Sequence, residues 1–233
     1  MSIYGITLRF LNATQAFLPA RWRLAIRYHA WLTSHTVEPE LVHLFELCRN
    51  FRTAIDIGAN HGMYTYKMAQ KFERVFAFEP NQQEDFDIHY WKKANVRLLP
   101  YGLSDAPQVA QLYIPIHKGH RYNGWASVGQ RDLPFADAIE QVAIELQRLD
   151  DQPFVREHPI DLIKIDVEGH ELEVLNGGLE TIRQHKPVLI IEHNETQAAE
   201  IGRLLLGLGY RSLSFSEFSQ RELPSPNRIY FPL

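Results

Sequence analysis

The stretch Thr53-Ala54-Ile55-Asp56-Ile57-Gly58-Ala59-Asn60-His61-Gly62 decides the fold of this chain. Its first half is a short β-branched run, which predicts a buried strand at residues 53–57. Gly58 and Gly62 then let the backbone turn sharply and approach a ligand, before a helical pattern over residues 63–72. Ligands bind beyond the carboxyl ends of the strands in open parallel sheets, so we expect a binding loop between the two glycines.

Strand and helix patterns alternate along most of the remaining chain. This alternation predicts an α/β fold built on a doubly wound, mostly parallel sheet of seven strands. We expect the C-terminal strand to run antiparallel, because a short turn-rich loop joins the final pair of strands. The further strands are expected at residues 74–78, 96–100, 161–166, 188–192, 210–215 and 228–231, and the further helices at 83–93, 169–185 and 196–208.

A region at about residues 106–150 breaks this rhythm. Residues 109–115 and 142–149 alternate as strands do, and His117–Pro134 between them is rich in glycine, arginine, histidine and aromatic residues. Binding groups gather on such inserted loops, so we expect the insert to contact the substrate and to determine which acceptor is bound. The candidate substrate-contacting residues of the insert are His117, Arg121, Tyr122 and Trp125.

The first 50 residues carry helical patterns and a local excess of basic charge. Four arginines and no acidic residue occur before Glu38, whereas the whole chain has a formal net charge of −4. We favour a helical cap at residues 1–50, packed on a domain of residues 51–233. The sequence leaves two alternatives open, namely a basic amphipathic patch in residues 1–35 that touches a membrane surface or a partner, and an arginine-rich targeting segment.

The composition excludes several classes of protein. The chain has 233 residues, of which 45% are hydrophobic and 22% charged, as in an ordinary globular domain. Cys48 is the only cysteine, which excludes an internal disulfide and a multi-cysteine metal site and favours a cytoplasmic protein, peripheral to a membrane if the basic cap binds one. No apolar run reaches the ~18 residues of a spanning helix. The acidic body argues against a nucleic-acid partner, since that needs a basic face.

Ionisable residues follow several of the predicted strands. Glu79 ends the second strand, where a carboxylate can accept two hydrogen bonds from a ribose diol. Ser104 and Asp105 follow the third strand, at the place where an adenine amino group would be held. Lys164-Ile165-Asp166-Val167-Glu168-Gly169-His170-Glu171 and Glu192-His193-Asn194 follow two later strands. Taken singly, each acid is also compatible with the capping of a helix N-terminus.

In their order and spacing, these motifs resemble the FkbM family of class I S-adenosylmethionine-dependent methyltransferases. The resemblance runs roughly from Thr53 to Glu192 and implies a Rossmann-like class I methyltransferase fold. It also implies S-adenosylmethionine as cofactor and methyl transfer to hydroxyls of sugars and natural products, but it does not fix the acceptor. The motifs that carry it are Asp56–Gly62, Phe78-Glu79-Pro80, Leu103-Ser104-Asp105, Leu149-Asp150-Asp151 and Lys164–Glu171.

The resemblance implies a role for each motif. The residues expected around the methionine part of the cofactor are Asp56, Gly58, Asn60 and Gly62. Glu79 would hold the ribose, and Ser104 with Asp105 the adenine end. Asp166 would sit beside the sulfonium and the acceptor hydroxyl, with Glu168, His170 and Glu171 supporting that side.

Methyl transfer to an alcohol oxygen needs help with the hydroxyl proton. Asp166 and His170 are the candidate bases, and the sequence does not choose between them. A Mg²⁺-assisted variant is a further hypothesis, since Asp166, Glu192 and Asn194 offer oxygen ligands at adjacent strand ends. Glu192 and His193 are also candidates for contact with the acceptor.

The sequence therefore predicts an O-methyltransferase that acts on a hydroxyl of a sugar, glycan or glycosylated natural product. One alternative is methylation of a lipid-linked or peptide acceptor at a membrane surface. Another is a non-catalytic regulator that binds the cofactor on the same fold. The oligomeric state is not readable from the sequence.

Overall fold

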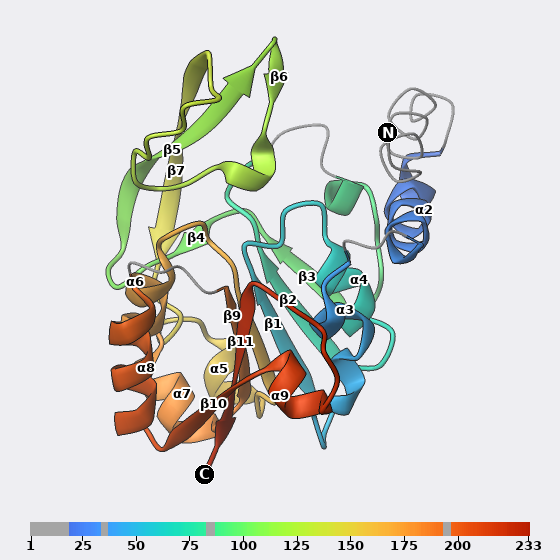
Figure 1. Cartoon of the computed structure of the whole chain (residues 1–233), viewed down its shortest axis with the longest axis vertical. Helices are drawn as coiled ribbons and strands as arrows, with labels where there is room; N and C mark the ends of the chain where they lie inside the picture. Colours follow the sequence, from blue (N-terminus) through green and yellow to red (C-terminus); the bar gives the residue numbers. More distant parts are fainter. Residues whose placement is uncertain (1–18, 34–36, 83–86, 193–196) are drawn as a thin grey trace.

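A seven-stranded sheet runs through the computed structural model, which describes residues 19–33, 37–82, 87–192 and 197–233 (Figure 1). The strand order is β10-β11-β9-β8-β1-β2-β3. All neighbours pair in parallel except β11, which is antiparallel to both β9 and β10. The predicted doubly wound sheet with an antiparallel C-terminal strand is thus confirmed. The strands are β1 (Thr53–Ile57), β2 (Arg74–Phe78), β3 (Val96–Leu99), β8 (Leu162–Ile165), β9 (Val188–Glu192), β10 (Tyr210–Ser214) and β11 (Asn227–Pro232).

The direction in which strands are added to the sheet reverses beside β1. From β1 the chain proceeds outward to β2 and β3, whereas β8 and β9 are added on the other side of β1. Open α/β sheets bind their ligands in the crevice at such a reversal. The loops that follow β1, β2 and β8 therefore meet at one edge of the sheet, which is the upper edge in Figure 1.

Both faces of the sheet are buried, because successive residues of the strands are apolar and their side chains point alternately to the two faces. Ile55 and Ile163 point to the face covered by α5 to α8, while Ala54 and Leu162 point to the face covered by the cap, α4 and α9. Each fully buried aliphatic side chain contributes about 1.5–3 kcal/mol. The helices are α4 (Met63–Met68), α5 (Phe154–Glu157), α6 (Glu171–Asn176), α7 (Leu179–His185), α8 (Ala198–Gly207) and α9 (Phe215–Ser219).

The described part of the N-terminal cap packs on the second of these faces. It contains α2 (Ala20–Leu32), α3 (Pro39–Val42) and the 3₁₀ turn η2 (Leu44–Glu46), where the sequence pattern predicts one continuous helix over 39–48. Tyr28 and Leu41 are buried in the same apolar cluster as residues of β1 and α4. Cap and sheet therefore share a core. The helical pattern predicted before Pro19 lies outside the described residues.

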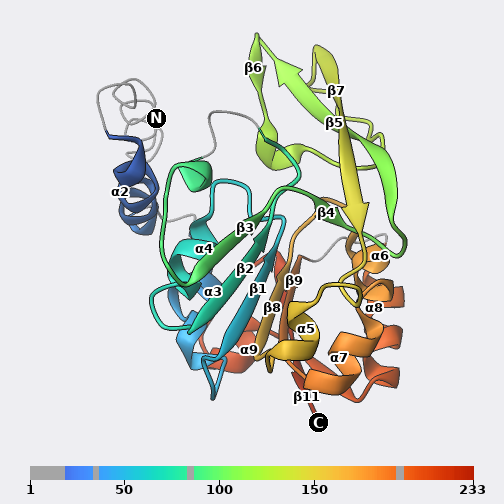
Figure 2. The same cartoon turned by 180° about the vertical axis from the view of Figure 1, so that it is seen from behind.

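The insert forms a second, four-stranded sheet above the carboxyl ends of the main sheet (Figure 2). Its strand order is β4-β7-β5-β6, and the two long strands β5 and β7 pair antiparallel. Both are longer than the predicted strands, and one face of the pair buries Leu112, Ile114, Ile144 and Leu146. The elements of the insert are β4 (Gly102–Leu103), β5 (Gln108–His117), β6 (His120–Arg121), the 3₁₀ turn η4 (Asn123–Trp125) and β7 (Ala138–Gln147).

Two predicted helices differ from those in the structure. Of the helix predicted at 83–93, the described residues form only the 3₁₀ turn η3 (Asp87–His89). The helix predicted at 169–185 is split into α6 and α7 at Gly177 and Gly178. A Cβ atom on Gly177 would lie 2.0 Å from the carbonyl oxygen of Ser104, so the glycine lets the break pack directly against the chain that follows β4.

Among the residues that the structure describes, no helix combines the length and the apolar character needed to cross a bilayer.

Gly177 offers a test of this packing. Gly177→Ala should lower the free energy of unfolding by about 1–3 kcal/mol, because the added methyl group overlaps the backbone of Ser104. Gly202→Ala is the matched control, since nothing lies within 4 Å of a Cβ built at this position of α8. That change should stabilise the protein by about 0.5–1 kcal/mol through helix propensity. Urea unfolding of both variants measures the difference, and equal effects would contradict the steric account.

Candidate active site

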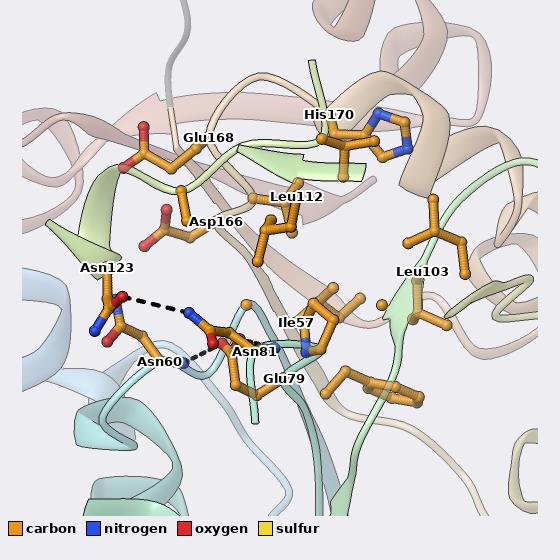
Figure 3. Close-up of a pocket in the computed structure, with 18 of the residues that line it drawn as sticks. Ile57, Asn60, Glu79, Asn81, Leu103, Leu112, Asn123, Asp166, Glu168 and His170 are labelled. Atoms are coloured by element: carbon orange, nitrogen blue, oxygen red, sulfur yellow. Dashed lines mark hydrogen bonds between the residues drawn. The ribbon is translucent and has the colours of Figure 1, made fainter. Parts of the chain in front are cut away.

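Two adjoining cavities lie at the carboxyl ends of β1, β2 and β8, beneath the insert, and Figure 3 shows the inner one. Gly58, Asn60, Gly124 and Asp166 line both cavities, so the cavities meet at these residues. We call them the inner cavity and the outer cavity, and the outer one has a volume of about 670 Å³. The inner cavity is further lined by residues that include Ile57, Glu79, Asn81, Leu103, Leu112, Glu168 and His170, and the outer cavity by Arg27, Trp31, Glu38, Tyr64, Tyr122 and Trp125.

The glycine loop after β1 forms one wall of both cavities. The backbone is left-handed at Gly58, Asn60 and Gly62, with φ angles of 78°, 50° and 93°. A Cβ atom on Gly58 would lie 1.8 Å from the carbonyl oxygen of Asp166, so only glycine permits this approach between the ends of β1 and β8. Gly58 and Asn60 line the cavities as expected for a binding loop, whereas Gly62 precedes α4 and is not part of either lining.

Asp56 lies beneath this loop and outside both linings. Its side chain is fully buried, and its Oδ2 accepts a hydrogen bond of 2.5 Å from the hydroxyl of Thr65 in α4. Burial raises the pKa of Asp56, while the nearby charge of Lys164 acts to lower it. In this structure Asp56 therefore ties β1 to α4 and to β8, and the cofactor contact predicted for it is not seen among the lining residues.

Glu79 presents a buried carboxylate to the inner cavity. Its Oε2 accepts the backbone N–H of Asn60 at 2.7 Å, and its Oε1 accepts the backbone N–H of Asn81 at 2.8 Å (Figure 3). Burial raises the pKa of Glu79 to about 7, although both N–H groups act to lower it. Two backbone donors thus fix the orientation of the carboxylate, and each oxygen keeps a lone pair for a hydroxyl of a ligand.

Two amide oxygens in the inner cavity lack a donor. Oδ1 of Asn60 and Oδ1 of Asn81 are buried and accept no hydrogen bond from the described residues. The amide of Asn81 also donates to Oδ1 of Asn123 at 3.4 Å, which links the loop after β2 to the insert. Buried acceptors without a donor are uncommon, so these oxygens are suited to donors on a ligand. Asn81 was not a candidate from sequence, where its only signal is its place two residues after Glu79.

Ser104 and Asp105 lie outside the lining of the inner cavity. Leu103, the residue before them, lines it instead. Ser104 is fully buried, and its hydroxyl donates to Oδ1 of Asp105 at 3.1 Å, while Asp105 itself is exposed. This corner of the cavity is therefore apolar, and the adenine contacts predicted for the two polar side chains are not seen here.

His170 lines the inner cavity only. Its Nε2 lies 2.9 Å from the hydroxyl of Ser104, and its Nδ1 lies 3.6 Å from Oε2 of Glu173, so both ring nitrogens face protein groups. In Figure 3 its ring lies across the cavity from Asp166. The structure thus separates the two candidate bases, and only Asp166 reaches the outer cavity.

Asp166 is held by Lys164, which lies two residues earlier at the end of β8. The ammonium nitrogen of Lys164 lies 2.8 Å from Oδ2 of Asp166, and Lys164 is only 4% exposed. Burial acts to lower the pKa of this lysine, but the negative charges of Asp166, Asp56 and Glu38 outweigh burial and raise it above its ordinary value. Lys164 is therefore a buried cation at the centre of three carboxylates.

Three carboxylates also gather beyond the ends of β8 and β9. Oxygen atoms of Asp166, Glu168 and Glu192 lie within 4.8 Å of one another. Arg131 of the insert pairs with Glu168 at 2.5 Å. Burial and the negative charges of Asp166 and Glu168 raise the pKa of Glu192, and the side chain shares a hydrogen bond with Asp166. Glu192 does not line either cavity.

This acidic cluster does not suit Mg²⁺ without rearrangement. Its oxygen atoms are the ligand type that Mg²⁺ prefers, and the structure does bring the predicted ligands Asp166 and Glu192 together. However, a lysine and an arginine already pair with two of the three carboxylates, Asp166 and Glu168. The remaining predicted ligand, Asn194, lies outside the described residues, as does the predicted acceptor contact His193.

The predicted substrate residues of the insert divide into two pairs. Tyr122 and Trp125 line the outer cavity. Arg121 instead pairs at 2.6 Å with a glutamate of β7, and Nδ1 of His117 lies 3.2 Å from an aspartate beside that strand. The structure therefore places the aromatic pair, and not the basic pair, in the lining of the outer cavity.

The family model of the methyltransferase FkbM domain matches residues 56–212, which is more than half of the chain. The chain belongs to the FkbM methyltransferase family. This family match covers the glycine loop, Glu79 and the whole segment that carries Asp166.

Individual relatives agree with this assignment. The chain is similar to Methyltransferase 1 of Beauveria bassiana (strain ARSEF 2860), with 30% identity over 145 residues, and to Methyltransferase sdnD of Sordaria araneosa, with 30% identity over 155 residues. Each match covers 53% of this chain, and the chain spans only 57% and 59% of the two relatives. A crystal structure of an FkbM methyltransferase from Methylobacillus flagellatus KT matches with a TM-score of 0.53 and 20% identity, over 90% of this chain and 53% of that one, which supports the fold.

The FkbM match begins at Asp56, so the cap lies before the matched domain. Arg27, Trp31 and Glu38 of the cap nevertheless line the outer cavity. The sequence pattern did not identify these three residues as site residues, because an amphipathic pattern shows which face of a helix is buried but not which cavity it borders.

Lys164 offers a test of the charge balance in this FkbM site. Lys164→Met should lower the free energy of unfolding by about 3–5 kcal/mol at neutral pH, because a broken buried ion pair leaves buried charge uncompensated. The loss should be larger at pH 8 than at pH 5. In the wild-type protein the charge of Lys164 acts to lower the pKa of Asp56, so the substitution should raise this pKa further. A carboxylate whose folded pKa lies above its unfolded value costs stability as the pH increases.

Urea unfolding at the two pH values measures this effect. Lys92→Met, at an exposed position, is the control and should change the unfolding free energy by less than about 0.5 kcal/mol. A loss for Lys164→Met that is the same at both pH values would contradict the account.

Proposed function

We propose that this chain is an S-adenosylmethionine-dependent O-methyltransferase that acts on a hydroxyl of a sugar, glycan or glycosylated natural product. The observation that carries the proposal is the position of Asp166, whose side chain lines both cavities. A carboxylate at this junction reaches a donor in the inner cavity and an acceptor in the outer one. Membership of the FkbM family supports methyl transfer, and a base at the junction supports an oxygen acceptor, because a hydroxyl needs help to lose its proton.

The inner cavity has the groups that an adenosyl cofactor requires. The carboxylate of Glu79 is oriented to accept hydrogen bonds from the ribose hydroxyls. The donor-less oxygens of Asn60 and Asn81 are suited to amino groups of the cofactor. Leu103 and Leu112 supply apolar surface for a flat base.

Asp166 and Lys164 have separate tasks in the mechanism that we propose. Bound S-adenosylmethionine supplies an electrophilic methyl group. Asp166 accepts the proton of the acceptor hydroxyl as the oxygen atom attacks, and the ion pair with Lys164 holds its carboxylate at the junction. His170 is less suited as base, since its two nitrogens face Ser104 and Glu173 and it does not line the outer cavity.

Calorimetric titration with S-adenosylhomocysteine tests the cofactor site. We expect micromolar binding that weakens up to about tenfold from pH 8 to pH 6, because Glu79, with a pKa of about 7, loses its charge over this range. Glu79→Gln should weaken binding by roughly 10- to 100-fold at pH 8, as expected for lost hydrogen bonds to a charged group, and should remove the pH dependence. Absence of binding to the wild-type protein would overturn the proposal.

Asp166→Asn separates binding from catalysis in the same assay. This variant should bind S-adenosylhomocysteine with little change and should lose methyl transfer to hydroxyl acceptors, because it keeps the shape of the side chain but not the base. Turnover that survives the substitution would contradict the role of Asp166. Cofactor binding without transfer to any acceptor would favour the non-catalytic alternative.

Chelation tests the metal hypothesis. Thorough treatment with EDTA should leave cofactor binding and methyl transfer unchanged, because side-chain cations already neutralise Asp166 and Glu168. Activity is compared before and after treatment, and after addition of Mg²⁺. Loss of activity that Mg²⁺ restores would instead support a metal at Asp166 and Glu192.

A further inference from the structure

The outer cavity is enclosed by three parts of the chain that are distant in sequence. Trp31 comes from α2, Trp125 from η4 of the insert, and Asp166 from the end of β8. Figures 1 and 2 show the insert and α2 rising on opposite sides of the edge of the sheet. The volume of about 670 Å³ falls in the range of about 300–1,000 Å³ that is typical of pockets for drug-sized ligands. The cavity is therefore large enough for an acceptor of more than one ring.

The cap wall of this cavity is anchored to the domain. Nε of Arg27 donates to Oδ2 of Asp87 at 2.5 Å, and the side chain of Asp87 is only 1% exposed. Leu24 and Tyr28, on the same helix, are buried. These contacts hold α2 in one position, so residues of the cap can take part in recognition.

Glu38 directs a carboxylate into the same cavity. Its Oε2 accepts hydrogen bonds from the hydroxyl of Tyr64 at 2.5 Å and from the amide of Asn227 at 2.9 Å. Burial and the charge of Glu38 raise the pKa of Tyr64, so the tyrosine stays a donor. Both of these hydrogen bonds fall on Oε2, and Glu38 lines the cavity with a second carboxylate oxygen, Oε1. That oxygen is therefore suited to a hydroxyl of a ligand.

The lysine and the arginine among the described lining residues of the outer cavity both form ion pairs with carboxylates. Lys164 pairs with Asp166, and Arg27 pairs with Asp87. Burial and the charge of Arg27 lower the pKa of His61 to about 4, so this histidine is neutral at neutral pH. Among the described lining residues, each lysine and arginine is paired with a carboxylate, while the carboxylate of Glu38 would repel a phosphate.

Aromatic side chains complete the lining. Trp31, Tyr122 and Trp125 offer flat apolar surfaces from the cap and from the insert. The apolar face of a sugar ring packs on such surfaces, while hydroxyls at its rim donate to carboxylates. Aromatic walls with two carboxylates, and no unpaired lysine or arginine among the lining residues that the structure describes, match a neutral, hydroxyl-rich ring.

We propose that Trp31 and Glu38 of the cap bind the acceptor, which is a neutral glycoside with one hydroxyl at Asp166 and a second at Glu38. The proposal rests on the proposed function of the same site and adds the charge class of the acceptor and the residues that select it. A sugar joined to an uncharged group fits this cavity, and a sugar nucleotide does not. The spacing of the two carboxylates then determines which hydroxyl is methylated.

The test uses the full chain with S-adenosylmethionine and a panel of neutral methyl and 4-nitrophenyl hexopyranosides, alongside the matching UDP-sugars. Formation of S-adenosylhomocysteine measures turnover. We expect the best neutral glycoside to exceed its UDP counterpart by at least about tenfold in kcat/KM, as unfavourable charge contacts oppose the phosphates. Trp31→Leu and Glu38→Gln should each raise KM for that glycoside by about tenfold or more, since each removes an acceptor contact.

Two measurements make the test specific. Affinity for S-adenosylhomocysteine should stay within about twofold in both variants, because neither residue lines the inner cavity. Trp22→Leu is the matched control on the same helix, where the side chain is 54% exposed and outside the lining, and it should leave KM unchanged.

Three results would overturn the inference. They are no transfer to any neutral glycoside, faster transfer to a UDP-sugar, and an unchanged KM in both cap variants. Each of these leaves cofactor binding intact, whereas failure of the proposed function appears as absent binding of S-adenosylhomocysteine to the wild-type protein, or as binding without transfer to any hydroxyl acceptor, UDP-sugars included.

Discussion

The buried ammonium group of Lys164 is the interaction on which the rest of this site depends. β8 lies beside β1 in the middle of the sheet, and its end is surrounded by the carboxylates of Asp56, Asp166 and Glu38. Buried carboxylates without a counter-charge would cost several kcal/mol each, so the lysine stabilises this edge of the sheet. The same ion pair orients Asp166 where the two cavities meet. The ion pair between Lys164 and Asp166 thus both stabilises the fold and positions Asp166 at the junction of the two cavities.

A steric constraint acts together with this electrostatic one. Gly58 allows the ends of β1 and β8 to touch, and it thereby brings the glycine loop and Asp166 to one place. Glu79, at the end of β2, binds the same loop through the N–H of Asn60. The three strand ends therefore form one rigid frame, as a site that must align two reacting groups requires.

The two cavities differ in which parts of the chain build them. The inner cavity is built from the strand ends of the sheet and from the insert, within the FkbM domain. The outer cavity adds the cap, which lies before the matched domain. Under the function that we propose, this division would separate binding of the cofactor from recognition of the acceptor.

The sequence by itself determined the seven strands, the glycine loop, and the places of Glu79 and Asp166 at the carboxyl ends of the strands. These features follow from local patterns, because alternating apolar residues define a buried strand and the residue after a strand must lie at its edge. Only the tertiary structure decided that Leu103, and not Ser104, lines the inner cavity, and that Trp31 and Glu38 border the outer cavity. Such contacts depend on distances between segments far apart in the chain, which no local pattern records. The raised pKa of Glu192 has the same origin, since it arises from burial and from neighbouring charges that meet only in the folded protein.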